Sequence, residues 1–339
     1  TPQEASHLAQ TRKVNPDAYD AYLRGRHFWE QRTLPSFGRA LEFYEQAIEL
    51  DPEYAQVHAA VASAHMLRAI YEYSDPIDAY EQAREAAQRA IEIDPSVGEA
   101  YSVLAHIIQF VDRDWDLADQ TFREAIRLSP KNVQTHLFYA FYLMVSNRLE
   151  DAENTIADAE RVDPLSPLAG AFRVQLAMYR DQADAAIEIA VRNLEIYPDF
   201  PATLWRIGEA YLMAGKPDKA VEAFERLVFL TDRSPLSLSL LGMAYGKSGQ
   251  AELAKVIAGE IAANTPNPSL LAGRLARISL GLGEHALAIQ QVQESLGSAQ
   301  FSTVELHASP LWASLREDPR IGAIIDQIMG SSEAESSEE

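Results

Sequence analysis

The sequence predicts an all-α fold, a solenoid of about eight helix-turn-helix units with a capping helix at each end. Alanine recurs at nearly fixed intervals, the residues around it recur with it, and proline follows most units. The intervals are 43, 35 and then five times 34 residues, and the alanines are Ala40, Ala83, Ala118, Ala152, Ala186, Ala220, Ala254 and Ala288. A period of roughly 20–50 residues is typical of repeat architectures, in which neighbouring units bury one continuous core.

The second helix of each unit carries the repeated alanine. Four residues after it stand Tyr44, Ala87, Phe122, Ile156, Ala190, Phe224, Ala258 and Val292. An offset of four residues lies on the same face of an α-helix, so we expect this face to be buried. Twelve residues after the alanine, six units have a proline: Pro52, Pro95, Pro130, Pro164, Pro198 and Pro266. Since proline lacks the amide that a helix interior needs, it separates one unit from the next.

The first helix of each unit precedes the alanine. Small residues such as Gly208 and Gly242 stand twelve positions before it, so the two helices of a unit can approach closely. The first unit has about three extra residues around Arg32, and the second has about nine between Met66 and Pro76. We expect those two turns to protrude from the solenoid.

The unit resembles the tetratricopeptide repeat, because Ile207, Gly208, Tyr211, Gly215, Ala220 and Phe224 match its consensus signature. The resemblance covers roughly residues 17–300 and implies a right-handed superhelix. Residues 15–26 and 310–320 resemble the borders of the repeat region in bacterial signalling proteins. There, such repeats follow an adenylate cyclase, a serine/threonine kinase, or a winged-helix domain with a TolB-like segment. The resemblance implies a regulatory or interaction module, and leaves open which effector domain, if any, accompanies it.

Four segments are expected along the chain. An N-terminal capping helix occupies residues 1–16, the eight repeats residues 17–300, a C-terminal capping helix residues 301–330 and an acidic tail residues 331–339. The caps are expected because the exposed ends of a solenoid need a polar cover. The tail SSEAESSEE has no large apolar side chain to bury, so it is expected to be disordered.

The composition excludes several classes of function. The formal net charge is −21, with 29 Lys plus Arg against 50 Asp plus Glu. Nucleic acid is therefore disfavoured as a partner, because phosphate backbones need a basic surface. No apolar run is long enough for direct membrane insertion. Cysteine is absent, which leaves the bacterial cytoplasm, periplasm and exterior all permitted.

A search for chemistry finds no catalytic, cofactor or metal site. The segment from Gly242 to Ser248 is similar to a P-loop, but it has one residue too few and follows no predicted strand. His58 and His65 are two helical turns apart, which does not suit one metal ion. No GxSxG motif is present. We therefore predict that the chain is not an enzyme.

The tetratricopeptide resemblance implies that the first helices line a concave groove that binds protein. The residues expected to face it are Leu137, Phe141, Met144, Leu168, Met178, Tyr179, Trp205, Leu212, Met213, Leu236 and Met243. Aromatic and methionine side chains are enriched in contact surfaces. Two alternatives stay open, a register shifted by one residue and a superhelix coiled tightly enough to bury its own inner face.

The predicted function is a non-enzymatic scaffold that binds a helical or extended apolar protein segment in this groove. The groove lacks the Lys and Asn set with which some family members hold a C-terminal carboxylate. The alternative is a structural protein that assembles with copies of itself into a fibre or tube, because the two ends of a solenoid are unlike. The sequence does not identify the partner or decide between monomer and assembly.

Overall fold

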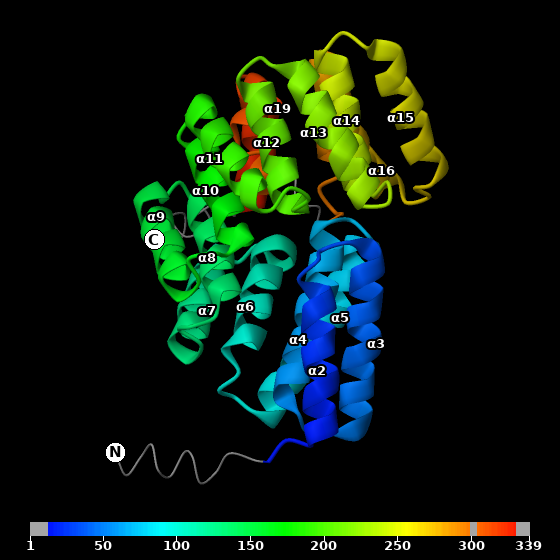
Figure 1. Cartoon of the computed structure of the whole chain (residues 1–339). Helices are drawn as coiled ribbons and strands as arrows, with labels where there is room; N and C mark the ends of the chain where they lie inside the picture. The colour runs from blue at the N-terminus through cyan, green and yellow to red at the C-terminus, as the bar shows by residue number, and fades with distance from the viewer. Residues whose placement is uncertain (1–12, 299–303, 330–339) are drawn as a thin grey trace, which may run out of the picture.

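The computed structural model describes residues 13–298 and 304–329. It confirms the all-α solenoid, with eight pairs of helices stacked in chain order (Figure 1). The first helices are α2 (Pro16–Trp29), α4 (Ala55–Ile70), α6 (Gly98–Ile107), α8 (Val133–Val145), α10 (Pro167–Tyr179), α12 (Pro201–Met213), α14 (Pro235–Lys247) and α16 (Pro268–Gly281). The second helices are α3 (Leu34–Leu50), α5 (Pro76–Ile93), α7 (Trp115–Leu128), α9 (Leu149–Val162), α11 (Ala183–Ile196), α13 (Pro217–Leu230), α15 (Ala251–Ala263) and α17 (His285–Glu294).

The repeated alanines form the centre of each pair. All eight are fully buried, as the offsets along the second helix predict. At Gly208 an added Cβ would lie 2.3 Å from the ring of Phe224, so only glycine lets α12 and α13 approach this closely. The core is therefore built unit by unit from the sequence period.

In each pair, the turn between the two helices contains one residue in the left-handed region of φ. These residues, with φ between 54° and 79°, are Arg32, Glu72, Arg113, Asn147, Asp181, Gly215, Gly249 and Gly283. Three are glycines, for which this conformation carries no steric penalty. In the third unit a π-helical turn, η1 (Ile108–Asp112), ends the first helix. A π-turn accommodates one extra residue within a helix, which accounts for the 35-residue interval.

The superhelix closes on itself between the second pair and the last. Figure 1 shows α4 and α5 directly below α14 and α16. The Nε atom of Arg274 on α16 donates to the Glu72 carboxylate over 2.8 Å, and Asn267 donates to Asp75 over 3.3 Å. These contacts join residues about 200 positions apart, so the concave face is enclosed by distant units.

The expectation that the two lengthened turns protrude is wrong. Arg32, Ser36, Tyr71 and Glu72 are all buried. The turns point inward because the superhelix is tight, and distant units meet their polar groups: Arg32 donates to Gln134 over 3.1 Å.

The C-terminal segment runs back along the solenoid. It contains the 3-10 helix η2 (Pro310–Leu315), which packs on α12, and α19 (Pro319–Met329), which contacts α17 of the last pair. The indole of Trp115, at the start of α7, donates to the carbonyl oxygen of Ile328 over 3.0 Å. The segment expected as a C-terminal cap therefore also reaches the sixth and third units. Residues 1–12 of the N-terminal helix expected at 1–16, and the acidic tail at 331–339, lie outside the described residues, while Pro16 already belongs to α2.

None of the helices among the described residues combines the length and the apolarity of a membrane span.

Candidate functional site

The concave face is the inner surface formed by α6, α8, α10, α12 and α14. The eleven residues expected to line a groove lie on the last four of these helices. The structure buries eight of them, namely Leu137, Phe141, Met144, Leu168, Met178, Trp205, Leu236 and Met243. Tyr179, Leu212 and Met213 are half-buried. Met178 and Met213 pack with Ala186 of α11, which corresponds to the shifted-register alternative, whereas burial of the others agrees with either alternative. Binding of a partner at these residues stays a prediction, and it requires that the partner displace what covers them.

The chain's own residues 304–315 cover part of the concave face. Val304, Leu306, Trp312 and Leu315 of this segment are each at most 3% exposed. The Glu305 carboxylate accepts hydrogen bonds from Gln175 Nε2 on α10 and from Arg206 Nη1 on α12, each over 3.4 Å. An apolar segment with one anchoring carboxylate therefore lies against two first helices.

Two carboxylates share the guanidinium of Arg206. Glu209, one turn along α12, accepts from Arg206 Nη1 over 2.7 Å, and Glu305 accepts from the same atom. Burial raises the pKa of Glu305 to about 7, against the opposing effect of Arg206, and the nearby Glu209 raises this pKa further. The docking of the segment is thus linked to the protonation of Glu305.

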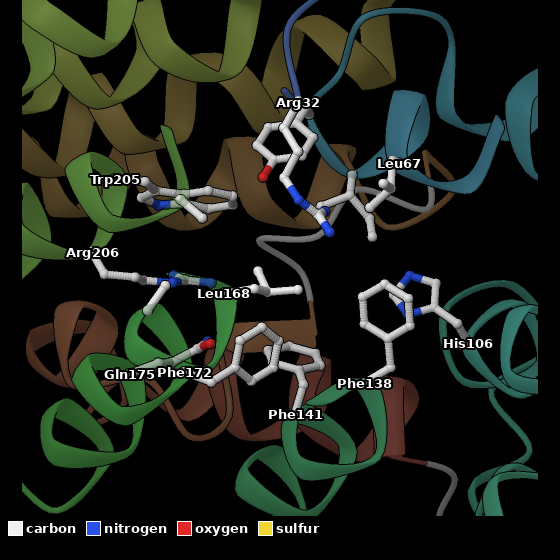
Figure 2. Close-up of a pocket in the computed structure, with 14 residues that line it drawn as sticks. Arg32, Leu67, His106, Phe138, Phe141, Leu168, Phe172, Gln175, Trp205 and Arg206 are labelled. Carbon is white, nitrogen blue, oxygen red and sulfur yellow. The ribbon is translucent and has the colours of Figure 1, made fainter. Parts of the chain in front are cut away.

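A small central cavity of about 50 Å³ lies beside this cluster (Figure 2). Six successive units contribute to its wall, and the residues are Arg32, Leu67, Ile70, Tyr71, His106, Phe138, Phe141, Leu168, Ala171, Phe172, Gln175, Ala202, Trp205 and Arg206. Most of these side chains are apolar or aromatic.

His106 on α6 is held neutral in this wall. Its ring stacks on Phe110 with centroids 4.2 Å apart, and its Nε2 lies 3.2 Å from the Tyr80 hydroxyl. Burial lowers the pKa of His106 to about 3, because the charged imidazolium is disfavoured away from water. His106 therefore offers the cavity a neutral, aromatic surface.

Within residues 13–298 and 304–329 no group of three or more His, Asp or Glu could hold a metal ion. Gly242, in the P-loop-like segment, lies inside α14, where an added Cβ would be 2.8 Å from Ile278. This glycine therefore serves helix packing. His58 Nε2 donates a hydrogen bond to the carbonyl oxygen of Pro52 over 2.9 Å.

Sequence reasoning missed Arg32 and Glu305 as residues of the concave face. Both belong to segments outside the regular 34-residue pattern, so the period carries no information about their orientation. A charged residue inside an insertion, three positions from the buried Trp29, is the one local signal that pointed to Arg32.

Comparisons with known proteins agree with this fold. A family model described as tetratricopeptide repeat matches residues 173–236. The transcriptional regulator HilA of Salmonella typhimurium is 27% identical over 173 residues, which are 51% of this chain and 31% of HilA. The chain thus spans about a third of the length of that relative.

Two solved structures are similar in fold. The APC/C hetero-tetramer Cut9-Hcn1 matches with a TM-score of 0.54 and 17% identity, covering 94% of this chain and 67% of the other. A monomeric mutant of IFIT1 with Gppp-AAAA matches with a TM-score of 0.55 and 14% identity, covering 86% of this chain and 73% of the other.

Proposed function

We propose, from the premise that this chain is a tetratricopeptide-repeat protein, that it binds a helical or extended apolar segment of a protein partner on its concave face. The tetratricopeptide fold supports a protein-protein interaction scaffold, since stacked helix pairs create an extended inner surface for partners. Proteins of this fold are generally non-catalytic scaffolds, and we propose the same for this chain.

The proposal rests on the position of residues 304–315, which lie against the concave face. Apolar side chains of this segment, including Leu306 and Trp312, are buried against the solenoid. Glu305 supplies the one carboxylate, which Gln175 and Arg206 hold. A partner segment with apolar side chains and one acidic residue would meet the same surface, so the C-terminal segment acts as its competitor.

A regulatory role is the second part of the proposal. The relative HilA is a transcriptional regulator and matches half of this chain. The borders of the repeat region also resemble those of bacterial signalling proteins. We therefore place this chain in a bacterial regulatory system, where occupancy of the concave face would transmit the signal.

A peptide-binding experiment tests the concave face directly. The chain truncated after Ser298 is titrated with a fluorescent peptide of residues 304–318, after circular dichroism has established that the truncated chain is folded. We expect saturable binding, weakened about tenfold by Arg206→Met, because a hydrogen bond to a charged group contributes about 1.5–3 kcal/mol. A peptide with Leu306→Asp is the control and should not bind. If the truncated chain is folded and does not bind the native peptide, the proposal is refuted.

Self-assembly is the second candidate, favoured by one feature of the outer surface. Phe229, Leu253 and Val256 are 73%, 45% and 65% exposed on α13 and α15, and they line a shared groove there. Sedimentation velocity at several concentrations distinguishes the two candidates. A constant sedimentation coefficient favours the scaffold, and growth that Phe229→Ser abolishes favours assembly.

A further inference from the structure

The second helices of the sixth and seventh units enclose an open apolar groove on the outer surface. It lies between α13 and α15, and α14, which packs against both helices, contributes side chains to it (Figure 1). The buried side chains of Val228, Leu241 and Ile257 line its depth. Its volume of about 570 Å³ is far larger than the 50 Å³ of the central cavity.

Exposed apolar side chains form the rim of this groove. Phe229 of α13 is the most exposed large apolar side chain among the described residues, at 73%. Leu253 and Val256 of α15 are exposed along the same groove. A single exposed apolar residue is ordinary, whereas a contiguous apolar patch marks a surface that contacts another molecule.

The two arginines beside the groove are already paired. Arg226 lies 2.7 Å from a carboxylate oxygen of Asp199, and its guanidinium is 5.1 Å from the ring centroid of Phe229. Arg233, which lines the groove, donates two hydrogen bonds to Glu260 over 2.8 and 2.5 Å. Because a carboxylate balances each guanidinium, neither arginine gives the groove a net positive charge.

Two carboxylates that line the groove have no cationic partner. Glu225 accepts a hydrogen bond from the neutral Tyr245 hydroxyl over 2.9 Å. Within residues 13–298 and 304–329, neither Glu225 nor Asp232 forms an ion pair within 4 Å, and both are exposed. The groove therefore combines an apolar interior with a negative rim. A positively charged partner complements such a rim, because opposite charges steer two proteins together and fix their register.

The walls of the groove favour a helix as the bound segment. The backbone amides and carbonyls of α13 and α15 bond within their own helices, so an extended segment would bury backbone groups without partners. A helix satisfies its own backbone and presents side chains at i, i+3, i+4 and i+7 to a groove. The walls, of 14 and 13 residues, are each about 20 Å long, which suits a helix of similar length.

The charge of the chain disfavours a second copy in this groove. The formal net charge is −21, so two copies repel each other. A two-fold symmetric contact through the groove would also bring Glu225 and Asp232 close to the same residues of the other copy. A basic segment avoids both costs.

We propose that the groove between α13 and α15 binds a basic amphipathic helix of a partner protein. Its apolar side chains would pack on Phe229, Leu253 and Val256, and a Lys or Arg would lie beside Glu225 or Asp232. This site belongs to second helices, whereas the concave face belongs to first helices. The scaffold would therefore hold two protein segments at once, one on each face.

Fluorescence anisotropy with three labelled synthetic peptides of equal length tests the proposal on the full chain. The first peptide has Leu at i, i+3, i+4 and i+7 along one helix face and Lys elsewhere. The second has Glu in place of Lys, and the third scrambles the first so that Leu does not form one face. We expect saturable binding of the first at micromolar concentration, and at least about tenfold weaker binding of the other two. The scrambled peptide measures attraction that depends on charge alone.

Two substitutions place the first peptide in the groove. Phe229→Ser and Leu253→Ser should each weaken its binding about tenfold, and circular dichroism checks that both variants are folded. Leu23→Ser is the matched control, because Leu23 on α2 and Leu253 are 46% and 45% exposed. It should bind the first peptide as the parent does. Arg206→Met, which alters the concave face, should also leave this binding unchanged.

Several results would overturn the proposal. These are equal binding of the three peptides, no binding of the first, or a loss in Leu23→Ser equal to that in Leu253→Ser. A loss in Arg206→Met with none in Phe229→Ser would place the peptide on the concave face instead. Concentration-dependent sedimentation of the parent that Phe229→Ser abolishes, without peptide binding, would show that a second copy occupies the groove.

Discussion

Glu72 is the residue on which the closure of the superhelix depends most directly. Its carboxylate lies 2.8 Å from Arg274 Nε and 3.8 Å from Arg277 Nη1, and all three side chains are at most 5% exposed. Thr265 and Ser239 accept further hydrogen bonds from the two arginines. Glu72→Gln keeps the size of this side chain and removes the carboxylate that pairs the second unit with two arginines of the last.

The size of the effect follows from burial. Removing one partner of a buried ion pair destabilises a protein by about 3–5 kcal/mol, because the remaining charge stays buried. Glutamine retains one acceptor oxygen for Arg274, so the lower end, about 3 kcal/mol, is expected. A change of that size raises the population of the opened superhelix more than about 100-fold.

Hydrogen exchange measured by mass spectrometry resolves where the opening occurs. We expect faster exchange in peptides from α4, its turn and α16, with little change in α10 and α11, because repeat units lose stability locally. Small-angle scattering should show a larger radius of gyration.

Glu252→Gln is the matched control. Glu252 and Lys255 form an ion pair on the outside of α15, with side chains 87% and 61% exposed. The substitution removes the same charge and should leave exchange in α16 unchanged, because exposed pairs contribute little. If Glu72→Gln also leaves α16 protected, the ion pair does not hold the units together and the reasoning is refuted.

Three further predictions concern single residues. Ala220→Glu places a charge in the fully buried contact of α12 with α13, and we expect at least about 3 kcal/mol of destabilisation in urea titrations; an unchanged midpoint would contradict the repeat register. Trp205→Ala should reduce the free energy of unfolding by about 3–5 kcal/mol, because Trp205 is 4% exposed and contacts the ring of Tyr71; a loss below about 1 kcal/mol would place its ring in an open groove. The pKa of Glu305 is raised from 4.5 to about 7, so its contribution to folding is full below pH 4.5 and is lost as pH rises through 7. The free energy of unfolding of the parent relative to Glu305→Gln should therefore fall between pH 4.5 and 7, and a difference independent of pH would show that Glu305 is not buried.

The helix pairs could be predicted because their contacts are local. Ala220 and Phe224 lie one turn apart, and Gly208 lies within the same unit, so a 34-residue period specifies which side chains meet. The same reasoning assigned the eleven residues to the first helices, where the structure places them.

The burial of those eleven residues could not be predicted in the same way. It depends on how far each unit rotates relative to the last, a small angle that accumulates over eight units. Only then does α16 meet the turn after α4, with 202 residues between Arg274 and Glu72. No local pattern in the sequence encodes that meeting.

The two lengthened turns explain why the inner face is closed. A solenoid of identical 34-residue units would present equivalent side chains from every unit, and it would have no special group to pair across the superhelix. Arg32 and Glu72 come from the insertions instead, and each is buried against a distant unit, through Gln134 and Arg274 respectively. Burial of a charge is unfavourable unless it is matched, so these contacts favour one superhelical geometry over the many that stacked helix pairs alone would allow. Glu72 is matched by two arginines within the chain, whereas Arg32 donates to the Gln134 amide and lies over the ring of Trp29.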